Sequence, residues 1–305
     1  MRHNLAFHLH EVAPYINWLY FFHAWGFPAR LGSIARVHGC EACRKNWLYA
    51  FSTEERGRAQ EAMRLFDEAQ ALLQEMDSQY QTHAIVLLSE AYSEGDDIVL
   101  HNSTNEKPFR LPLLRQQSPS EDGTCWCLSD FIKPKALSMG DKEAEEMIGC
   151  FVCSVDRGME EQHADDEFQH LLHQTLADRL AEATAEKVHE MVRRELWGYA
   201  PHENLTLDEL FNERYRGKRP AVGYPSLPDQ SFNFLLDKLL DFASIGVTLT
   251  ENGAMRPHAS TSGLMISHPA ARHFSIGAIG EDQLSDYAQR RGIKKEELRK
   301  FLSPN

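Results

Sequence analysis

The chain of 305 residues is 42% hydrophobic and 25% charged, which gives enough apolar material for one sizeable core and excludes a disordered, collagen-like or disulfide-scaffold protein. Its 45 acidic residues outnumber the 32 Lys and Arg, and a net charge of −13 repels nucleic-acid phosphates and anionic lipid. We therefore expect a soluble globular protein with no nucleic-acid partner and no membrane partner.

The N-terminal segment carries no export or membrane signal. Residues 1–12 lack the apolar core and the small-residue cleavage site of a signal peptide. The apolar stretch Tyr15–Phe27 is too short to cross a bilayer. We therefore expect a cytoplasmic protein whose cysteines are reduced thiols.

The six cysteines fall in three close pairs: Cys40 and Cys43, Cys125 and Cys127, and Cys150 and Cys153. A structural zinc site typically uses two CxxC pairs on tight turns, and the first pair, which follows Gly39, suits such a turn. Cys150 and Cys153 lie in an expected buried strand, where residues three apart face opposite sides. The pattern favours buried or incidental cysteines and no metal, and a metal at Cys40 and Cys43 is the alternative.

The first third of the chain predicts a long helix followed by a pair of strands. Apolar residues recur at three- and four-residue steps over 53–77, after a capping box at Ser52–Glu55. Residues 84–92 and 97–102 predict two strands joined by a short turn, and the polar residues 103–123 predict a surface loop.

The rest of the chain mixes helices and strands. Helices are predicted over 165–196, 206–216, 230–243, 281–291 and 294–302, with Gly292 as a cap between the last two. Strands are predicted over 147–155, Gly246–Glu251, Ser262–His268 and His273–Ile279. This order has no βαβ regularity and predicts an α+β fold, with one domain over 1–305 whose first part, about 1–80, is helical.

Common catalytic motifs are missing from the sequence: there is no GxGxxG after a strand, no phosphate-binding GxxxxGK[ST] loop, no GxSxG and no HExxH. One loop, Arg219–Pro225, has an arginine beside two prolines and a glycine. Such a loop can hold backbone groups against a small ligand while Arg219 grips a carboxylate. The alternative is an ordinary structural loop with Arg219 in a surface ion pair.

Three segments in the same order resemble the activation domain of cobalamin-dependent methionine synthase: LADRLAEATAEKVHEMVRRELWGYAPHENL (176–205), RPAVGYPSLPDQ (219–230) and LTENGAMRPHASTSGLMISHP (249–269). Shorter matches extend the resemblance over nearly the whole chain: 15–18, 95–100, 128–135 and 282–293. The resemblance implies a C-shaped α+β domain, with a twisted antiparallel sheet flanked by helices, that binds S-adenosylmethionine. It also implies a repair role, in which one electron from a flavodoxin-type donor and a methyl group from S-adenosylmethionine convert cob(II)alamin to methylcobalamin.

The resemblance assigns ligand-binding roles to five residues. Arg219 matches the arginine that grips the methionine carboxylate, and Ala221 and Tyr224 match loop positions that contact the ligand. Glu182 and Glu213 match carboxylates lining the site, although each resembles an ordinary surface charge when taken alone. No residue is expected to act as a general acid or base.

Three positions depart from the family pattern. Asn17 replaces a usual aspartate, so an acceptor oxygen remains but the negative charge facing an ammonium group is lost. Met265 and Ile266 replace two aromatic residues, which leaves apolar packing in place of stacking against the ligand. The alternative function is therefore a non-catalytic docking or scaffold subunit of a corrinoid protein that has lost S-adenosylmethionine binding.

The sequence contains no DxHxxG cobalamin-ligand motif. We expect the cobalamin on a partner, a cobalamin-binding methionine synthase subunit, on which this chain acts in trans as one component of the methyltransferase. Six basic residues lie near the C-terminus, between Arg290 and Lys300. They suit either the landing surface of an acidic flavodoxin or a helix end whose cations offset the dipole and pair with Glu296 and Glu297.

Overall fold

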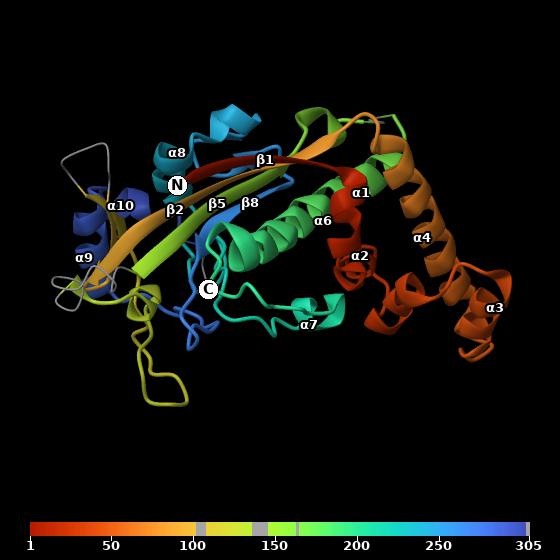
Figure 1. The fold of residues 1–305 in the computed structure, drawn as a ribbon, viewed down its shortest axis with the longest axis horizontal. Coiled ribbons are helices and arrows are strands. Elements are labelled where there is room, and N and C mark those ends of the chain that lie inside the picture. Colours follow the sequence, from red (N-terminus) through yellow and green to blue (C-terminus); the bar gives the residue numbers. More distant parts are fainter. Residues whose placement is uncertain (102–107, 136–145, 163–164, 303–305) are drawn as a thin grey trace.

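The computed structural model describes residues 1–101, 108–135, 146–162 and 165–302, and its centre is a strongly curled antiparallel sheet (Figure 1). The strand order is β4-β3-β2-β5-β8, and β1 pairs with the first half of β2. The strands are β1 (Arg2–His8), β2 (Gln81–Glu94), β3 (Asp97–Leu100), β4 (Phe109–Pro112), β5 (Glu146–Val155) and β8 (Ser260–Met265). A separate ribbon pairs β6 (Thr248–Leu249) with β7 (Met255–Arg256).

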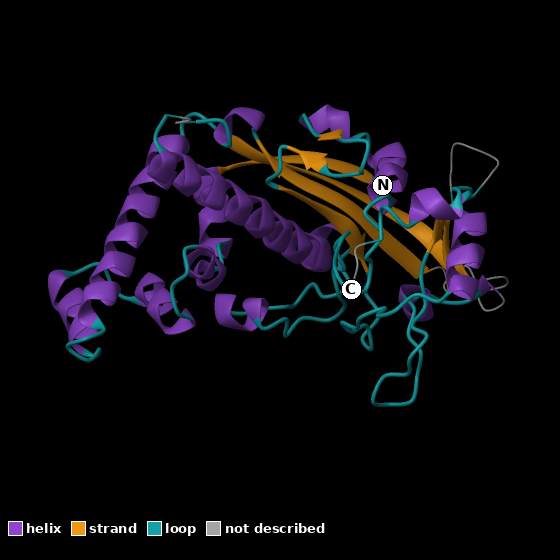
Figure 2. Ribbon diagram, turned by 180° about the vertical axis from the view of Figure 1, so that it is seen from behind, coloured by secondary structure: helices purple, strands orange, loops and turns teal. Residues whose placement is uncertain are grey.

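Helices cover both faces of the sheet (Figure 2). The long α6 (Glu167–Met191) packs on one face and α8 (Phe232–Leu240) on the other. Strand β5 is therefore buried on both sides, with Cys153 in the core beneath α6 and Cys150 in the core beneath α8. This placement confirms the prediction that these two thiols lie inside a strand and face opposite ways.

Shorter helices complete the chain. The N-terminal part contains α1 (Leu9–Val12), α2 (Trp18–Ala24), α3 (Glu41–Tyr49) and α4 (Arg56–Met76), with a 3-10 segment over Ala29–Arg36. We call residues 18–76 the helical arm, because α3 and the far end of α4 extend away from the sheet (Figure 1). After α6 come a π-helical turn (Val192–Leu196), α7 (Leu207–Phe211), α9 (Glu281–Arg291) and α10 (Lys295–Leu298). Among the described residues, no helix combines the length and the apolar character needed to cross a membrane.

The structure confirms the long helices and strands that were predicted from periodic apolar residues. Two other predicted segments differ from the structure. Residues 2–8, placed in a helical N-terminal part, form β1, because they pair with Gln81–Leu87 at the edge of β2. The predicted strand His273–Ile279 is irregular, since its backbone serves the neighbouring loop: the Ile276 N–H donates to the Pro225 carbonyl over 2.9 Å.

Two more boundaries differ from prediction. Within the loop predicted at 103–123, Phe109–Pro112 pairs with β3, and residues 103–107 lie outside the described part of the chain. The capping box at Ser52 forms only in part: the Glu55 carboxylate accepts from both the Ser52 N–H and the Ser52 hydroxyl. The hydroxyl is thereby diverted from the helix backbone, and α4 begins at Arg56 rather than at residue 53.

Candidate functional site

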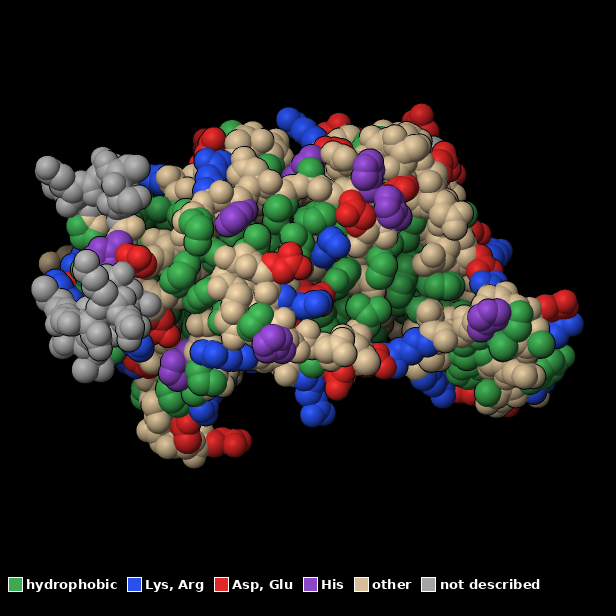
Figure 3. All heavy atoms as spheres, in the orientation of Figure 1, with side chains coloured by type: hydrophobic (Ala, Val, Ile, Leu, Met, Phe, Trp, Pro, Cys, Tyr) green, Lys and Arg blue, Asp and Glu red, His purple; other side chains and the backbone are tan. Residues whose placement is uncertain are grey.

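A cavity of about 710 Å³ lies beside α6, bounded by the loop at 219–226 and by residues 273–275. Acidic and basic side chains gather over α6 on this side of the molecule, among apolar ones (Figure 3). Six of the eight predicted site residues line this one cavity: Asn17, Glu182, Glu213, Arg219, Ala221 and Tyr224. The structure therefore brings together residues that are separated by more than 200 positions in the sequence.

The wall of the cavity on α6 carries two carboxylates. Glu182 and Glu186 are four residues apart, so they lie one above the other on the same face of the helix. The opposite face of α6 carries buried apolar residues such as Leu180 and Val188, which pack on the sheet. The predicted solvated face of this helix is thus the face that lines the cavity.

The loop opposite α6 is held in place by β8. The Val222 N–H donates to the Ser262 carbonyl over 2.9 Å, and Ala221 pairs with Gly263 in an antiparallel bridge. A Cβ atom on Gly263 would lie 2.2 Å from the Pro220 carbonyl oxygen, so only glycine allows this approach. The loop is consequently fixed as an extra strand segment at the edge of the sheet, not as a free surface loop.

Arg219 is the buried cation of the cavity. Its side chain is only 8% exposed and forms an ion pair with Glu186. Burial lowers the pKa of Arg219, but the carboxylates of Glu186 and Glu182 more than offset this, and the net pKa lies above its usual value. The guanidinium Nε and the second oxygen of Glu186 have no hydrogen-bond partner among the described residues. The pair therefore keeps unused hydrogen-bonding capacity beside the cavity.

Glu213 occupies the other acidic position and is already engaged. Its carboxylate accepts hydrogen bonds from His273 Nε2 and from Lys218 Nζ, each over 2.7 Å. The bond from His273 is the main cause that lowers the pKa of Glu213 to about 2. Its backbone has a φ of 52°, in the left-handed region. Glu213 is thus a fixed anion held between the Lys218 ammonium group and the His273 imidazole.

Two residues stand at the sides of the cavity. Tyr224 is 52% exposed, and the neighbouring Glu182 carboxylate raises the pKa of its hydroxyl, with burial adding to the effect. Asn17 is the N-cap of α2, where its side-chain oxygen accepts the Leu19 N–H over 3.2 Å. The oxygen that replaces a family carboxylate therefore already serves the helix.

The match to known proteins now decides the family. Residues 8–292 match the family described as vitamin B12 dependent methionine synthase, activation domain. The chain belongs to this family. It is also similar to a solved structure described as "Crystal Structure of the MetH Reactivation Domain bound to AdoHcy", at 32% identity and a TM-score of 0.84, over 100% of this chain and 90% of that one. The predicted fold, helices around a curled antiparallel sheet, is confirmed.

Two predicted residues lie away from the cavity of this activation domain. The side chains of Met265 and Ile266 are fully buried in β8 and the residue after it, one in each core beside the sheet. The backbone of Ile266 does hold the segment before the loop: Lys218 and Ile266 exchange two hydrogen bonds of 2.9 Å. In this structure these positions support the site from behind and do not line it.

Several residues that line the cavity were not predicted from the sequence: Tyr15, Tyr20, Arg179, Glu186 and His273. Glu186 could have been predicted from the sequence, because it follows Glu182 by one helical turn. His273 could not, since its contact with Glu213 joins residues 60 positions apart. A larger cavity of about 1180 Å³ lies between the helical arm and α7, and Asn17, Tyr20 and Phe211 line both cavities. Charged groups converge in the smaller cavity, which is therefore the candidate binding site.

The basic residues near the C-terminus are largely engaged within the chain. Arg291 pairs with the buried Asp229, and Arg290 donates to Asp97 over 2.6 Å. Lys295 and Arg299 both pair with Glu281, at the start of α9. Arg290 and Arg291 thus act as structural cations that join α9 to the sheet and to α8.

Proposed function

We propose that this activation domain binds S-adenosylmethionine in the 710 Å³ cavity and supplies its methyl group for the reductive reactivation of cob(II)alamin. The observation that carries the proposal is the convergence of Arg219 with Glu182 and Glu186 in one cavity of this family's fold. A volume of this size suits a ligand as large as S-adenosylmethionine.

The charges of the cavity complement the ligand. The α-carboxylate of S-adenosylmethionine would bind to the guanidinium of Arg219, which can form two parallel hydrogen bonds with a carboxylate. The sulfonium and ammonium groups would lie beside Glu182. In the free chain the Glu186 carboxylate is the partner of the Arg219 guanidinium, and the ligand carboxylate would replace it as that partner.

The chain's contribution to the reaction is positioning. It would hold the sulfonium with its methyl group toward the corrin, so that transfer of the methyl group leaves S-adenosylhomocysteine in the cavity. The solved structure similar to this chain is described as bound to AdoHcy, which is that product. We propose that the cobalamin is carried by a cytoplasmic methionine synthase subunit, on which this chain acts in trans, and that a flavodoxin-type protein supplies the electron.

Calorimetric titration with S-adenosylmethionine and S-adenosylhomocysteine tests the binding step. We expect saturable binding to the wild type, a loss of about a hundredfold or more in Arg219→Ala, and an intermediate loss in Arg219→Lys, which keeps the charge but not the planar fork. Arg216→Ala is the matched control, because Arg216 bonds to the Ser267 carbonyl and does not line the cavity.

Unchanged binding in folded Arg219→Ala would overturn the proposed site. Absence of binding in the wild type would favour the alternative, a docking subunit without ligand, for which the engaged oxygen of Asn17 is the supporting observation. The reactivation step is then tested by mixing the chain with a separately purified cob(II)alamin protein, a flavodoxin and S-adenosylmethionine. Formation of methylcobalamin only when the chain is present supports action in trans, and its absence contradicts it.

A further inference from the structure

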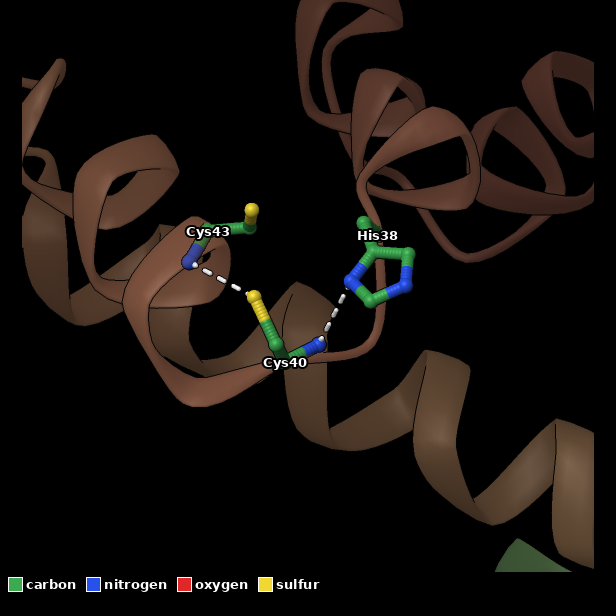
Figure 4. Close-up of side chains that lie close together, drawn as sticks. All are labelled: His38, Cys40 and Cys43. Atoms are coloured by element: carbon green, nitrogen blue, oxygen red, sulfur yellow. Dashed lines mark hydrogen bonds between the residues drawn. The ribbon is translucent and has the colours of Figure 1, made fainter.

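Three metal-ligating side chains meet in the helical arm, outside the cavity. His38 and Cys40 lie in the turn between the 3-10 segment Ala29–Arg36 and α3, and Cys43 lies in the first turn of α3. One ligand atom from each residue lies within 4.8 Å of the other two. Figure 4 shows the two sulfur atoms and the imidazole ring around the same space.

The backbone of this turn arranges the three side chains. Cys40 is the N-cap of α3, and its sulfur accepts the Cys43 N–H over 3.4 Å. Cys43 follows three residues later, so both thiols lie on the same side of the helix start. The Cys40 N–H donates to His38 Nδ1 over 3.3 Å, so the lone pair of this nitrogen faces the turn. A metal ion bound through Nδ1 would replace this hydrogen bond.

The two thiols of the helical arm are accessible to an ion from solvent. Cys40 is exposed and Cys43 is partly exposed. By contrast, Cys127, Cys150 and Cys153 are buried in the core. The pair in the helical arm therefore differs from the cysteines of the core in access.

We propose that His38, Cys40 and Cys43 bind one Zn²⁺ ion, with the fourth position open to solvent. Two thiolates and one imidazole form a donor set that suits zinc, whereas Mg²⁺ and Ca²⁺ prefer oxygen ligands. Ligand atoms of a tetrahedral zinc site lie about 3.3–3.8 Å apart, given Zn–S and Zn–N distances of about 2.3 and 2.0 Å. From the present limit of 4.8 Å the ligand atoms would have to approach one another by at most about 1.0–1.5 Å, which small side-chain rotations can provide.

The ion would brace the outer end of the helical arm. α3 is anchored there by Arg44, which donates to Asp67 of α4 over 2.6 Å, and by the Trp47 indole, which donates to Ser33 over 2.8 Å. A zinc ion at the N-terminus of α3 would add a third attachment, to the turn that precedes the helix. The site lies in the part of the arm that extends away from the sheet, so it is independent of the ligand cavity (Figure 1).

Titration with Co²⁺, followed by displacement with Zn²⁺, tests the site. The protein is kept anaerobic, and its free thiols are counted by alkylation before each titration. We expect one Co²⁺ per chain, a thiolate-to-cobalt charge-transfer band, and complete displacement by one Zn²⁺. Cys40→Ser/Cys43→Ser should abolish the band, and His38→Ala should weaken Zn²⁺ binding about a hundredfold or more, because even the loss of an outer-shell partner costs about 10–100-fold.

Cys125→Ser is the matched control, since Cys125 is a partly accessible thiol at a distant position in the chain. It should bind both metals like the wild type. A fully reduced chain without a charge-transfer band, or a band that persists in Cys40→Ser/Cys43→Ser, would overturn the proposal. A reduced chain that binds no zinc but forms a Cys40–Cys43 disulfide under mild oxidation would also overturn the proposal. The titration of Cys40→Ser/Cys43→Ser with S-adenosylmethionine should match the wild type, which separates this test from that of the proposed function.

Discussion

The guanidinium of Arg219 and the carboxylate of Glu186 form an ion pair in the cavity wall, although 33 residues separate them in the chain. Arg219 comes from a loop that is bonded to β8, and Glu186 from the C-terminal part of α6. Their side chains are 8% and 22% exposed. The pair therefore neutralises a buried cation and connects the two sides of the candidate site.

Glu186→Gln should bind S-adenosylmethionine several-fold more tightly than the wild type, because Arg219 is then available to the ligand carboxylate without competition. The same change should lower the free energy of unfolding by about 1–3 kcal/mol, since the guanidinium loses a charged partner. Calorimetry and urea unfolding measure the two effects. Glu195→Gln, at an exposed carboxylate after α6 and outside the cavity, should leave the affinity unchanged. A tenfold loss of affinity in Glu186→Gln would contradict this competition.

Gly263→Ala should release the ligand loop from β8. The added Cβ would lie 2.2 Å from the Pro220 carbonyl oxygen and 2.8 Å from the Cα of Ala221, both backbone atoms. We expect unfolding to become easier by about 1–3 kcal/mol and ligand binding to be lost, because the loop carries Arg219. Gly57→Ala is the control: nothing lies within 4 Å of its added Cβ, and alanine in α4 should stabilise by about 0.5–1 kcal/mol. Wild-type affinity in Gly263→Ala would show that the loop position is not critical.

The elements that were predicted correctly are those in which the pattern of apolar residues matches the buried surfaces of the element. The helix of α6 follows from apolar residues at helical spacing, and the buried strand β5 follows from an unbroken apolar run. Strand β1 could not be found in this way, because its residues are mostly polar and its structure comes from pairing with Gln81–Leu87. Pairing of this kind depends on distant parts of the chain.

The candidate site residues were chosen from the family resemblance. The stiff loop around Arg219 suits a carboxylate ligand but also suits an ordinary structural loop, and the resemblance assigned ligand roles to Arg219 and Glu182. The positions of Met265 and Ile266 show the limit of this reasoning. Strand β8 is covered on both faces, so their side chains enter the cores, and the backbone of Ile266 alone of the two bonds to the segment before the loop. A residue near a site in sequence can thus support it without facing it.

Glu213 should make stability depend on pH in the acid range. Its pKa is lowered to about 2 by His273 and Lys218, so its contribution is fully present above the unfolded-state value of about 4.3 and is lost as the pH falls toward 2. The side chain is 37% exposed, and after screening by solvent we expect a contribution of about 1 kcal/mol. The difference in unfolding free energy between the wild type and Glu213→Gln should therefore be largest above pH ~5 and shrink below it.

Urea unfolding at a series of pH values measures this difference. Glu251→Gln, at an exposed turn, should differ from the wild type by less than about 0.5 kcal/mol at every pH. A difference for Glu213→Gln that grows on acidification would mean that the carboxylate is not stabilised as an anion by its two neighbours.

Glu203→Gln should be among the most damaging single changes outside the cavity. The side chain of Arg193 is fully buried after α6, and its Nε and Nη2 donate to the Glu203 carboxylate over 2.9 and 2.6 Å. Its guanidinium also lies 4.1 Å from the ring centre of Tyr215. Removing one partner of such a pair leaves an uncompensated buried charge, so we expect a loss of about 3–5 kcal/mol in unfolding free energy. Urea unfolding measures this loss.

The control for this change is Glu195→Gln, an exposed carboxylate in the same π-helical turn as Arg193, which should stay within about 0.5 kcal/mol of the wild type. Replacing both partners, as Arg193→Met with Glu203→Leu, should restore much of the stability, since two apolar side chains leave no buried charge. If Glu203→Gln alone cost less than about 1 kcal/mol, the pair would not be the anchor that joins the end of α6 to the segment leading to the ligand loop.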